Sequence, residues 1–151
     1  MNPRVLAFTI LLLASAAAAC GPSSGAPAPP EIAYGLDVCE ACGMIVSDAR
    51  FAAATALEDG SALKFDDIGD MMRYHASRPN LRVQAWFVHD HPSEAWLEAQ
   101  NAAFALSPGI ASPMGHGLAA FADPAAAADY ATDIGGEVLT FNELRSRYAA
   151  P

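Results

Sequence analysis

Two extended runs, a helix and a further extended run occur twice along this chain, and this pattern restricts the fold more than any other feature of the sequence. Three residues of the first unit recur 56 positions later: Phe65, Asp67 and Tyr74 return as Phe121, Asp123 and Tyr130. The strand-like runs VQAWF and EVLTF follow the two helices. Self-similarity at a fixed spacing indicates a repeated structural unit. The sequence therefore predicts an α+β fold made of two homologous ββαβ lobes packed together.

The first unit carries clear local signals. Two partly apolar runs flank Asp59-Gly60, a pair typical of a β-hairpin turn. The next segment, FDDIGDMMRYHAS, predicts a short helix that Asp66 or Asp67 caps. The run LRVQAWFVHD is rich in aromatic and β-branched residues, which favour a strand.

The second unit follows a linking segment. Ser93 is expected to cap a helix over SEAWLEAQN, and AAFAL and LAAF are expected to form strands. Asp123 and Pro124 predict the start of the next helix, as its cap and its first residue. The strand EVLTF then leads to a short final helix, for which Asn142 is the expected cap.

The N-terminus predicts export and lipidation. A short basic start precedes fifteen apolar residues, 5–19, which are too few to span a bilayer comfortably and are typical of a signal peptide. Cys20 follows directly, as the lipidated cysteine of a bacterial lipoprotein does, although a plain secreted form is an alternative. We therefore expect a signal peptide over 1–19 and a lipidated Cys20 with a Pro/Gly/Ser-rich tether over 20–33. The first lobe covers 34–92, and the linking helix and second lobe cover 93–151.

The charge of the chain is strongly acidic. It has 8 Lys and Arg against 17 Asp and Glu, for a formal net charge of −9. No basic stripe is present, so nucleic-acid binding is not expected.

The segment CEACGM places two thiols and a thioether within six residues, and four kinds of site compete for it. Cys39 and Cys42 alone could form a disulfide that closes a very small loop. They could also form a redox pair, but such a pair begins a helix, and Gly43 disfavours a helix here. A structural zinc site needs two further ligands. The candidate imidazoles for it are His75, His89, His91 and His116.

The fourth kind of site binds Cu(I). Thiolate and thioether ligands are soft and select Cu(I) over harder cations. Met44 supplies one thioether, and a second is available at Met114 in SPMGHG, which lies between Pro and Gly on an expected loop. His116 is an added candidate ligand.

Other metal-binding side chains favour different interpretations. Met71 and Met72 lie in the predicted helix, where core packing is the expected role. His89 and His91 are two residues apart, so a strand would point both to one face, and they form a weaker candidate site. No Ser-His-Asp arrangement, phosphate loop or paired carboxylates stands out.

Four segments, taken in order after a lipoprotein signal, resemble the NosL family: CEACGM, FDDIGDMMRY, WFVHDHPSEAWLEAQNAAF and SPMGHGLAAF. The resemblance covers about residues 34–149. It implies a Cu(I)-binding lipoprotein with two homologous ββαβ lobes, related to part of the organomercurial lyase. It also implies a membrane-tethered chaperone on the periplasmic side of a bacterial membrane, expected to be the outer membrane. Its implied partners are an ABC-type copper maturation complex and nitrous oxide reductase.

The family's motifs fall on Cys39, Cys42 and Met44, on Phe65 to Asp67, and on Met114 with its neighbours. Because a chaperone must release its metal, we expect a copper site of Cys42, Met44 and Met114, completed by Cys39 or His116. The alternatives are an organomercurial-lyase-like enzyme with Asp66 or Asp67 as proton donor, and a copper lipoprotein that serves another cuproprotein or copper tolerance. A homodimer that shares the metal is also left open.

Overall fold

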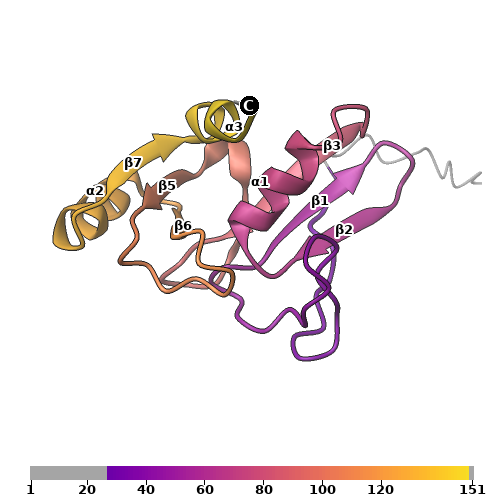
Figure 1. The fold of residues 1–151 in the computed structure, drawn as a ribbon, viewed down its shortest axis with the longest axis horizontal. Helices are drawn as coiled ribbons and strands as arrows, with labels where there is room; N and C mark the ends of the chain where they lie inside the picture. The colour runs from indigo at the N-terminus through magenta and orange to yellow at the C-terminus, as the bar shows by residue number, and fades with distance from the viewer. Residues whose placement is uncertain (1–26, 150–151) are drawn as a thin grey trace, which may run out of the picture.

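The computed structural model describes residues 27–149, so the expected signal peptide and Cys20 lie outside the described residues. The described chain folds into two small antiparallel sheets and three α-helices (Figure 1). No described helix has the length and apolar character needed to cross a bilayer.

The first sheet has the strand order β2-β1-β3-β4, from strands β1 Ala53–Leu57, β2 Ala62–Phe65, β3 Val83–His89 and β4 Trp96–Glu98. Helix α1, Ile68–Ala76, connects β2 to β3. The predicted hairpin is confirmed, with Gly60 at a φ of 85° in its turn. That left-handed conformation favours glycine, which explains the Asp-Gly pair in the sequence.

The second sheet repeats this topology with the order β6-β5-β7, from β5 Ala103–Leu106, β6 Leu118–Phe121 and β7 Glu137–Thr140. Helix α2, Pro124–Asp133, connects β6 to β7. In each unit the first strand lies between the other two, so the predicted ββαβ connectivity is present twice. Asp67 and Asp123 cap α1 and α2 through bonds to the amides of Gly69 and Ala125, as predicted.

The prediction of a helix after Ser93 is wrong. The structure has the edge strand β4 and a single 3-10 turn, Ala99–Asn101, in this region. The Ser93 hydroxyl donates to Asp90 and closes a tight turn, and Glu94 has a φ of 58° that no helix accommodates. Trp96 then pairs with His89 across the sheet and stacks on its ring at 3.6 Å between centroids. Tertiary stacking therefore outweighs local helix propensity.

Asn142 is not the cap of the last helix, α3, which spans Phe141–Ala149 and follows β7 directly. Thr140 and Glu143 instead form a reciprocal capping box. The Glu143 amide donates to the Thr140 hydroxyl at 3.3 Å, and the Thr140 amide donates to the Glu143 carboxylate at 2.8 Å.

One apolar core joins the two lobes. Helix α1 contacts both α3 and β6, and it stands between the two sheets (Figure 1). The fully buried Phe65, Ile68 and Met71 of the first lobe belong to the same cluster as Phe104 and Leu144 of the second. The expected packing role of Met71 is therefore confirmed, and Met72 is buried in the same cluster. A smaller cluster lies between the second sheet and α2.

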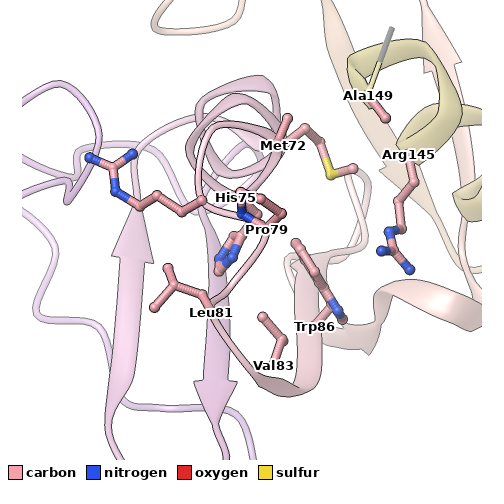
Figure 2. Close-up of a pocket in the computed structure, with 10 residues that line it drawn as sticks. Met72, His75, Pro79, Leu81, Val83, Trp86, Arg145 and Ala149 are labelled. Atoms are coloured by element: carbon pink, nitrogen blue, oxygen red, sulfur yellow. The ribbon is translucent and has the colours of Figure 1, made fainter.

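His75 is part of this core rather than a metal ligand. Its Nε2 lies 3.1 Å from the Thr55 hydroxyl, and its ring packs edge-on against Trp86 at 4.5 Å between centroids (Figure 2). Burial, with the positive charges of Arg78 and Arg145 nearby, lowers the pKa of His75 to about 4.

This buried imidazole predicts a specific loss of stability in acid. The unfolded chain binds a proton at His75 below pH 6.5, whereas the folded chain does so only below about pH 4. The contribution of neutral His75 is thus complete above pH 6.5 and decreases as the pH falls towards 4, by about 3 kcal/mol. Urea unfolding of the natural chain and of His75→Phe should show a stability gap that shrinks by this amount between pH 7.5 and pH 4. A gap that is constant with pH would contradict the assignment.

Candidate metal centre

The two cysteines lie in a tight turn that the first sheet holds in place. Val38 and Ile45 form an antiparallel bridge across the base of the turn, and the Cys39 amide donates to the Met44 carbonyl at 2.7 Å. The Glu40 amide donates to the Lys64 carbonyl of β2. Gly43 has a φ of 75°, which lets the chain reverse and explains the glycine of CEACGM.

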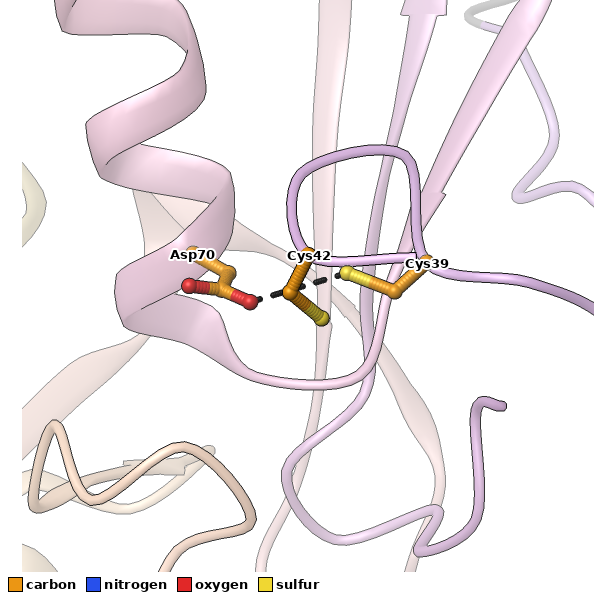
Figure 3. Close-up of side chains that lie close together, drawn as sticks. All are labelled: Cys39, Cys42 and Asp70. Atoms are coloured by element: carbon orange, nitrogen blue, oxygen red, sulfur yellow. Dashed lines mark hydrogen bonds between the residues drawn. The ribbon is translucent and has the colours of Figure 1, made fainter. Parts of the chain in front are cut away.

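Cys39, Cys42 and Asp70 are the one group of metal-binding side chains that converges among the described residues (Figure 3). Their ligand atoms lie within 4.8 Å of one another. Cys39 and Asp70 are buried, and Cys42 is partly buried. Both cysteines are free thiols in the structure, and the Cys39 Sγ donates to Asp70 Oδ2 at 3.6 Å.

Burial raises the pKa of the Cys42 thiol to about 12, and the proximity of Cys39 and Asp70 adds to this effect. The Cys42 thiol is therefore protonated at neutral pH. A metal that binds it must displace the proton, so binding at Cys42 releases a proton.

His116 approaches the cysteines through Asp70. Its Nε2 lies 3.0 Å from Asp70 Oδ1, so Asp70 links a thiol on one side to an imidazole on the other. Gly69 makes this approach possible, because a Cβ at that position would lie 2.2 Å from the His116 Cγ. The candidate metal ligands that meet here are two thiols, a carboxylate and an imidazole.

The SPMGHG segment reaches this place because the second hairpin has a long connection. Residues 107–117 join β5 to β6, whereas residues 58–61 suffice between β1 and β2. Asp67 fixes the long connection: its Oδ2 accepts from the Ser112 hydroxyl at 2.6 Å and from the Met114 amide at 3.1 Å. The fully buried carboxylate therefore caps α1 with one oxygen and holds the loop of the other lobe with the second.

The two candidate thioethers line different grooves. Met114 is 39% exposed and lines a groove of about 590 Å³ together with Cys42 and Asp70. Met44 is 58% exposed and lines a separate groove with Pro113. Met114 therefore lines the same groove as Cys42 and Asp70, while Met44 is exposed in the cysteine turn and lines another.

The histidines do not provide the two ligands of a Cys2His2 zinc site. His89 uses both ring nitrogens, at 3.1 Å from the Ala52 carbonyl and at 3.1 Å from the Tyr34 hydroxyl. His91 packs among the rings of Phe51, Phe121 and Tyr130. With His75 in the core, His116 alone among the four contacts the cysteine cluster, through Asp70.

Asp70 is the residue of this centre that sequence reasoning did not single out. It lies in the first turn of α1, three residues after the cap, where an acidic residue is ordinarily explained by the helix dipole. Its burial on the face of α1 that meets both loops is a consequence of the tertiary fold. The sequence did contain a signal for Asp70, because FDDIGD has three aspartates within five residues, separated only by Ile68 and Gly69.

Comparison with known proteins places the chain in a family. The family model described as NosL matches residues 34–149. The chain belongs to the NosL family. A curated NosL protein, the copper-binding lipoprotein NosL of Stutzerimonas stutzeri, is 29% identical over 154 residues, which covers 93% of this chain and 81% of that protein. The crystal structure of the copper chaperone NosL from Shewanella denitrificans has the same fold, with a TM-score of 0.63 and 20% identity over 76% of this chain and 96% of that one.

The bonds of Asp67 to the second lobe predict that the two helix caps of this NosL protein differ in how much an Asp→Asn substitution destabilises the fold. Asn caps a helix as well as Asp does, so the exposed Asp123→Asn should change the free energy of unfolding by less than about 0.5 kcal/mol. Asp67→Asn places an amide against the Met114 amide and should cost about 2–3 kcal/mol. Chemical unfolding of the two variants measures the difference, and equal costs would show that Asp67 is only a cap.

Proposed function

We propose that this protein is a lipid-anchored Cu(I) chaperone on the periplasmic side of a bacterial membrane, the outer membrane. Family membership and the copper-binding relative support a carrier of copper rather than an enzyme. The observation that carries the proposal is the convergence of Cys39, Cys42 and Asp70 beside the thioether of Met114. Cu(I) prefers thiolate and thioether ligands.

The donor set fits a metal that is carried and released. Cys39 is buried and anchors the site, whereas Cys42 is partly buried and Met114 is exposed at the mouth of a groove. A recipient can therefore approach two of the soft donors without unfolding the protein. Met44, exposed on the same turn, and His116, hydrogen-bonded to Asp70, are the further candidates for the copper shell.

Asp70 has a proton-handling role in this proposal. A thiol that takes up Cu(I) loses its proton, and the Cys39 proton already points to Asp70 Oδ2. The other Asp70 oxygen contacts His116, whose side chain is 15% exposed and so offers the proton a path towards solvent. Release of copper returns protons by the same contacts.

The recipient that we propose is the copper assembly machinery of nitrous oxide reductase, reached through an ABC-type maturation complex. This part of the proposal rests on the family alone. A NosL protein that serves another cuproprotein or copper tolerance would have the same site. Copper-depleted nitrous oxide reductase in a deletion strain distinguishes the first recipient from the others.

A second candidate function has one specific observation in its favour. Two thiols with a carboxylate in contact, Cys39, Cys42 and Asp70, form the constellation that an organomercurial lyase needs to bind mercury and protonate its carbon. The proton donor in this case is Asp70, because Asp66 accepts from Ser47 and Asp67 from Ser112, away from the thiols. Release of the hydrocarbon from an organomercurial over many turnovers separates this enzyme from a carrier.

The proposed function predicts a selective affinity. The reduced full chain in detergent should bind one Cu(I) tightly under anaerobic competition with a chelator and should bind Zn²⁺ much more weakly. Met114→Leu should weaken Cu(I) binding at least about tenfold through loss of a soft ligand, and Met44→Leu with Met114→Leu should weaken it further. Met71→Leu is the matched control, because Met71 is fully buried and a Leu of similar volume is tolerated there.

Two results would contradict this assignment. Tight zinc binding with weak Cu(I) binding would assign the cysteines, Asp70 and His116 to a zinc site. Unchanged Cu(I) affinity in the double thioether variant would restrict the copper ligands to Cys and His.

A further inference from the structure

The lysine and arginine side chains of this acidic protein are divided into two groups. The described residues include seven Lys and Arg, the eight of the full chain less Arg4. Four of them form ion pairs with carboxylates: Arg50, Lys64, Arg82 and Arg147. The other three, Arg73, Arg78 and Arg145, have no carboxylate within ion-pair distance among residues 27–149.

These three arginines border two adjoining grooves near the ends of α1 and α3. One groove of about 410 Å³ has Arg78 and Arg145 among its lining residues, and Figure 2 shows Arg145 and Trp86 on its wall. The other, of about 590 Å³, is bordered by Arg73 and Arg78 and contains Cys42 and Met114. Arg78 and Ala149 belong to both, so the two form one feature, which we call the arginine-lined groove.

Two of the guanidinium groups are stacked on aromatic rings. Arg78 lies 3.8 Å from the centroid of the Tyr74 ring and donates to the Ser77 hydroxyl at 2.9 Å. Arg145 lies 5.5 Å from the centroid of the Trp86 ring. A guanidinium stacked on a ring is held in place, and its remaining N–H groups are free to bind a carboxylate in two-pronged fashion.

Few carboxylates oppose this positive charge. Asp70 lies within the groove but is buried and already bonded to Cys39 and His116. Glu40 is not a lining residue, but it accepts at 3.3 Å from the hydroxyl of Tyr74, which does line the groove. The exposed charge of the groove is therefore positive on a chain whose net charge is −9.

We propose that the arginine-lined groove docks an acidic segment of the protein that exchanges copper with this one. This inference rests on the proposed function, because it concerns the partner of the same metal centre. The groove runs from Arg145 to Cys42, so carboxylates bound at its arginines place the partner directly over the exposed soft donors. Repulsion from the rest of the acidic surface disfavours other orientations.

An acidic protein segment fits the groove better than a membrane does. The groove is lined by residues of α1 and α3, and its arginines come from both helices and from the connection that follows α1. A lipid surface is broad and attracts basic residues that project outward together. Binding to anionic lipid is accordingly an outcome that the test must distinguish.

The test uses a fluorescein-labelled peptide of six glutamates, with the six-glutamine peptide as its neutral control, and the full chain in detergent micelles. The natural protein should bind the glutamate peptide saturably and more weakly as salt is added. The double variant Arg78→Gln/Arg145→Gln should weaken binding about tenfold. Arg50→Gln/Arg82→Gln is the matched control, because it removes the same charge from exposed positions outside the groove and should change binding less than about twofold.

Three outcomes would overturn the proposal. They are the absence of saturable peptide binding, equal weakening by both double variants, and loss of binding to phosphatidylglycerol vesicles in the groove variant while its peptide affinity is unchanged.

Cu(I) titration of the same proteins separates this proposal from the proposed function. Arg78→Gln/Arg145→Gln should bind Cu(I) as the natural protein does. A natural chain that binds the peptide but no Cu(I) would contradict the proposed function and the copper-exchange part of this inference together, and would leave only the acidic-segment site standing.

Discussion

The buried carboxylate of Asp67 is the interaction on which the rest of the centre depends. One oxygen caps α1 and the other holds the Ser112–Met114 segment of the second lobe. Its neighbour Asp66 accepts from the amide of Ser47 and so fixes the chain that follows CEACGM. The two residues that precede α1 thus anchor both loops that carry candidate metal ligands, and Asp70 in its first turn completes the contact between them.

The two lobes have the same connectivity but different roles. Asp123 occupies the same position as Asp67, yet it is exposed and its bond to the Ala125 amide is a simple cap. The first lobe supplies the thiols and the acidic helix turn, and the second supplies a long hairpin connection in place of a tight turn. The candidate metal centre therefore lies between the lobes, because neither lobe alone holds the thiols, Met114 and His116.

Local chemistry made much of the fold predictable. The Asp-Gly hairpin, the Asp caps and Pro124 act within a few residues, so the sequence showed them directly. The stacking of Trp96 on His89, which replaces a helix by a strand, is a tertiary contact that no local pattern reports. The same holds for the site: CEACGM and SPMGHG were recognisable, but Asp70 becomes significant only when α1 brings it to Cys39 and His116.

Copper X-ray absorption of the Cu(I)-loaded full chain, prepared once with methionine and once with selenomethionine, shows whether Met114 binds the metal. A copper centre between the lobes predicts a shell dominated by sulfur and a copper–selenium contribution in the labelled protein that Met114→Leu removes or reduces. A shell of nitrogen and oxygen, or no selenium contribution at all, would show that the interlobe loop does not bring its thioether to the metal.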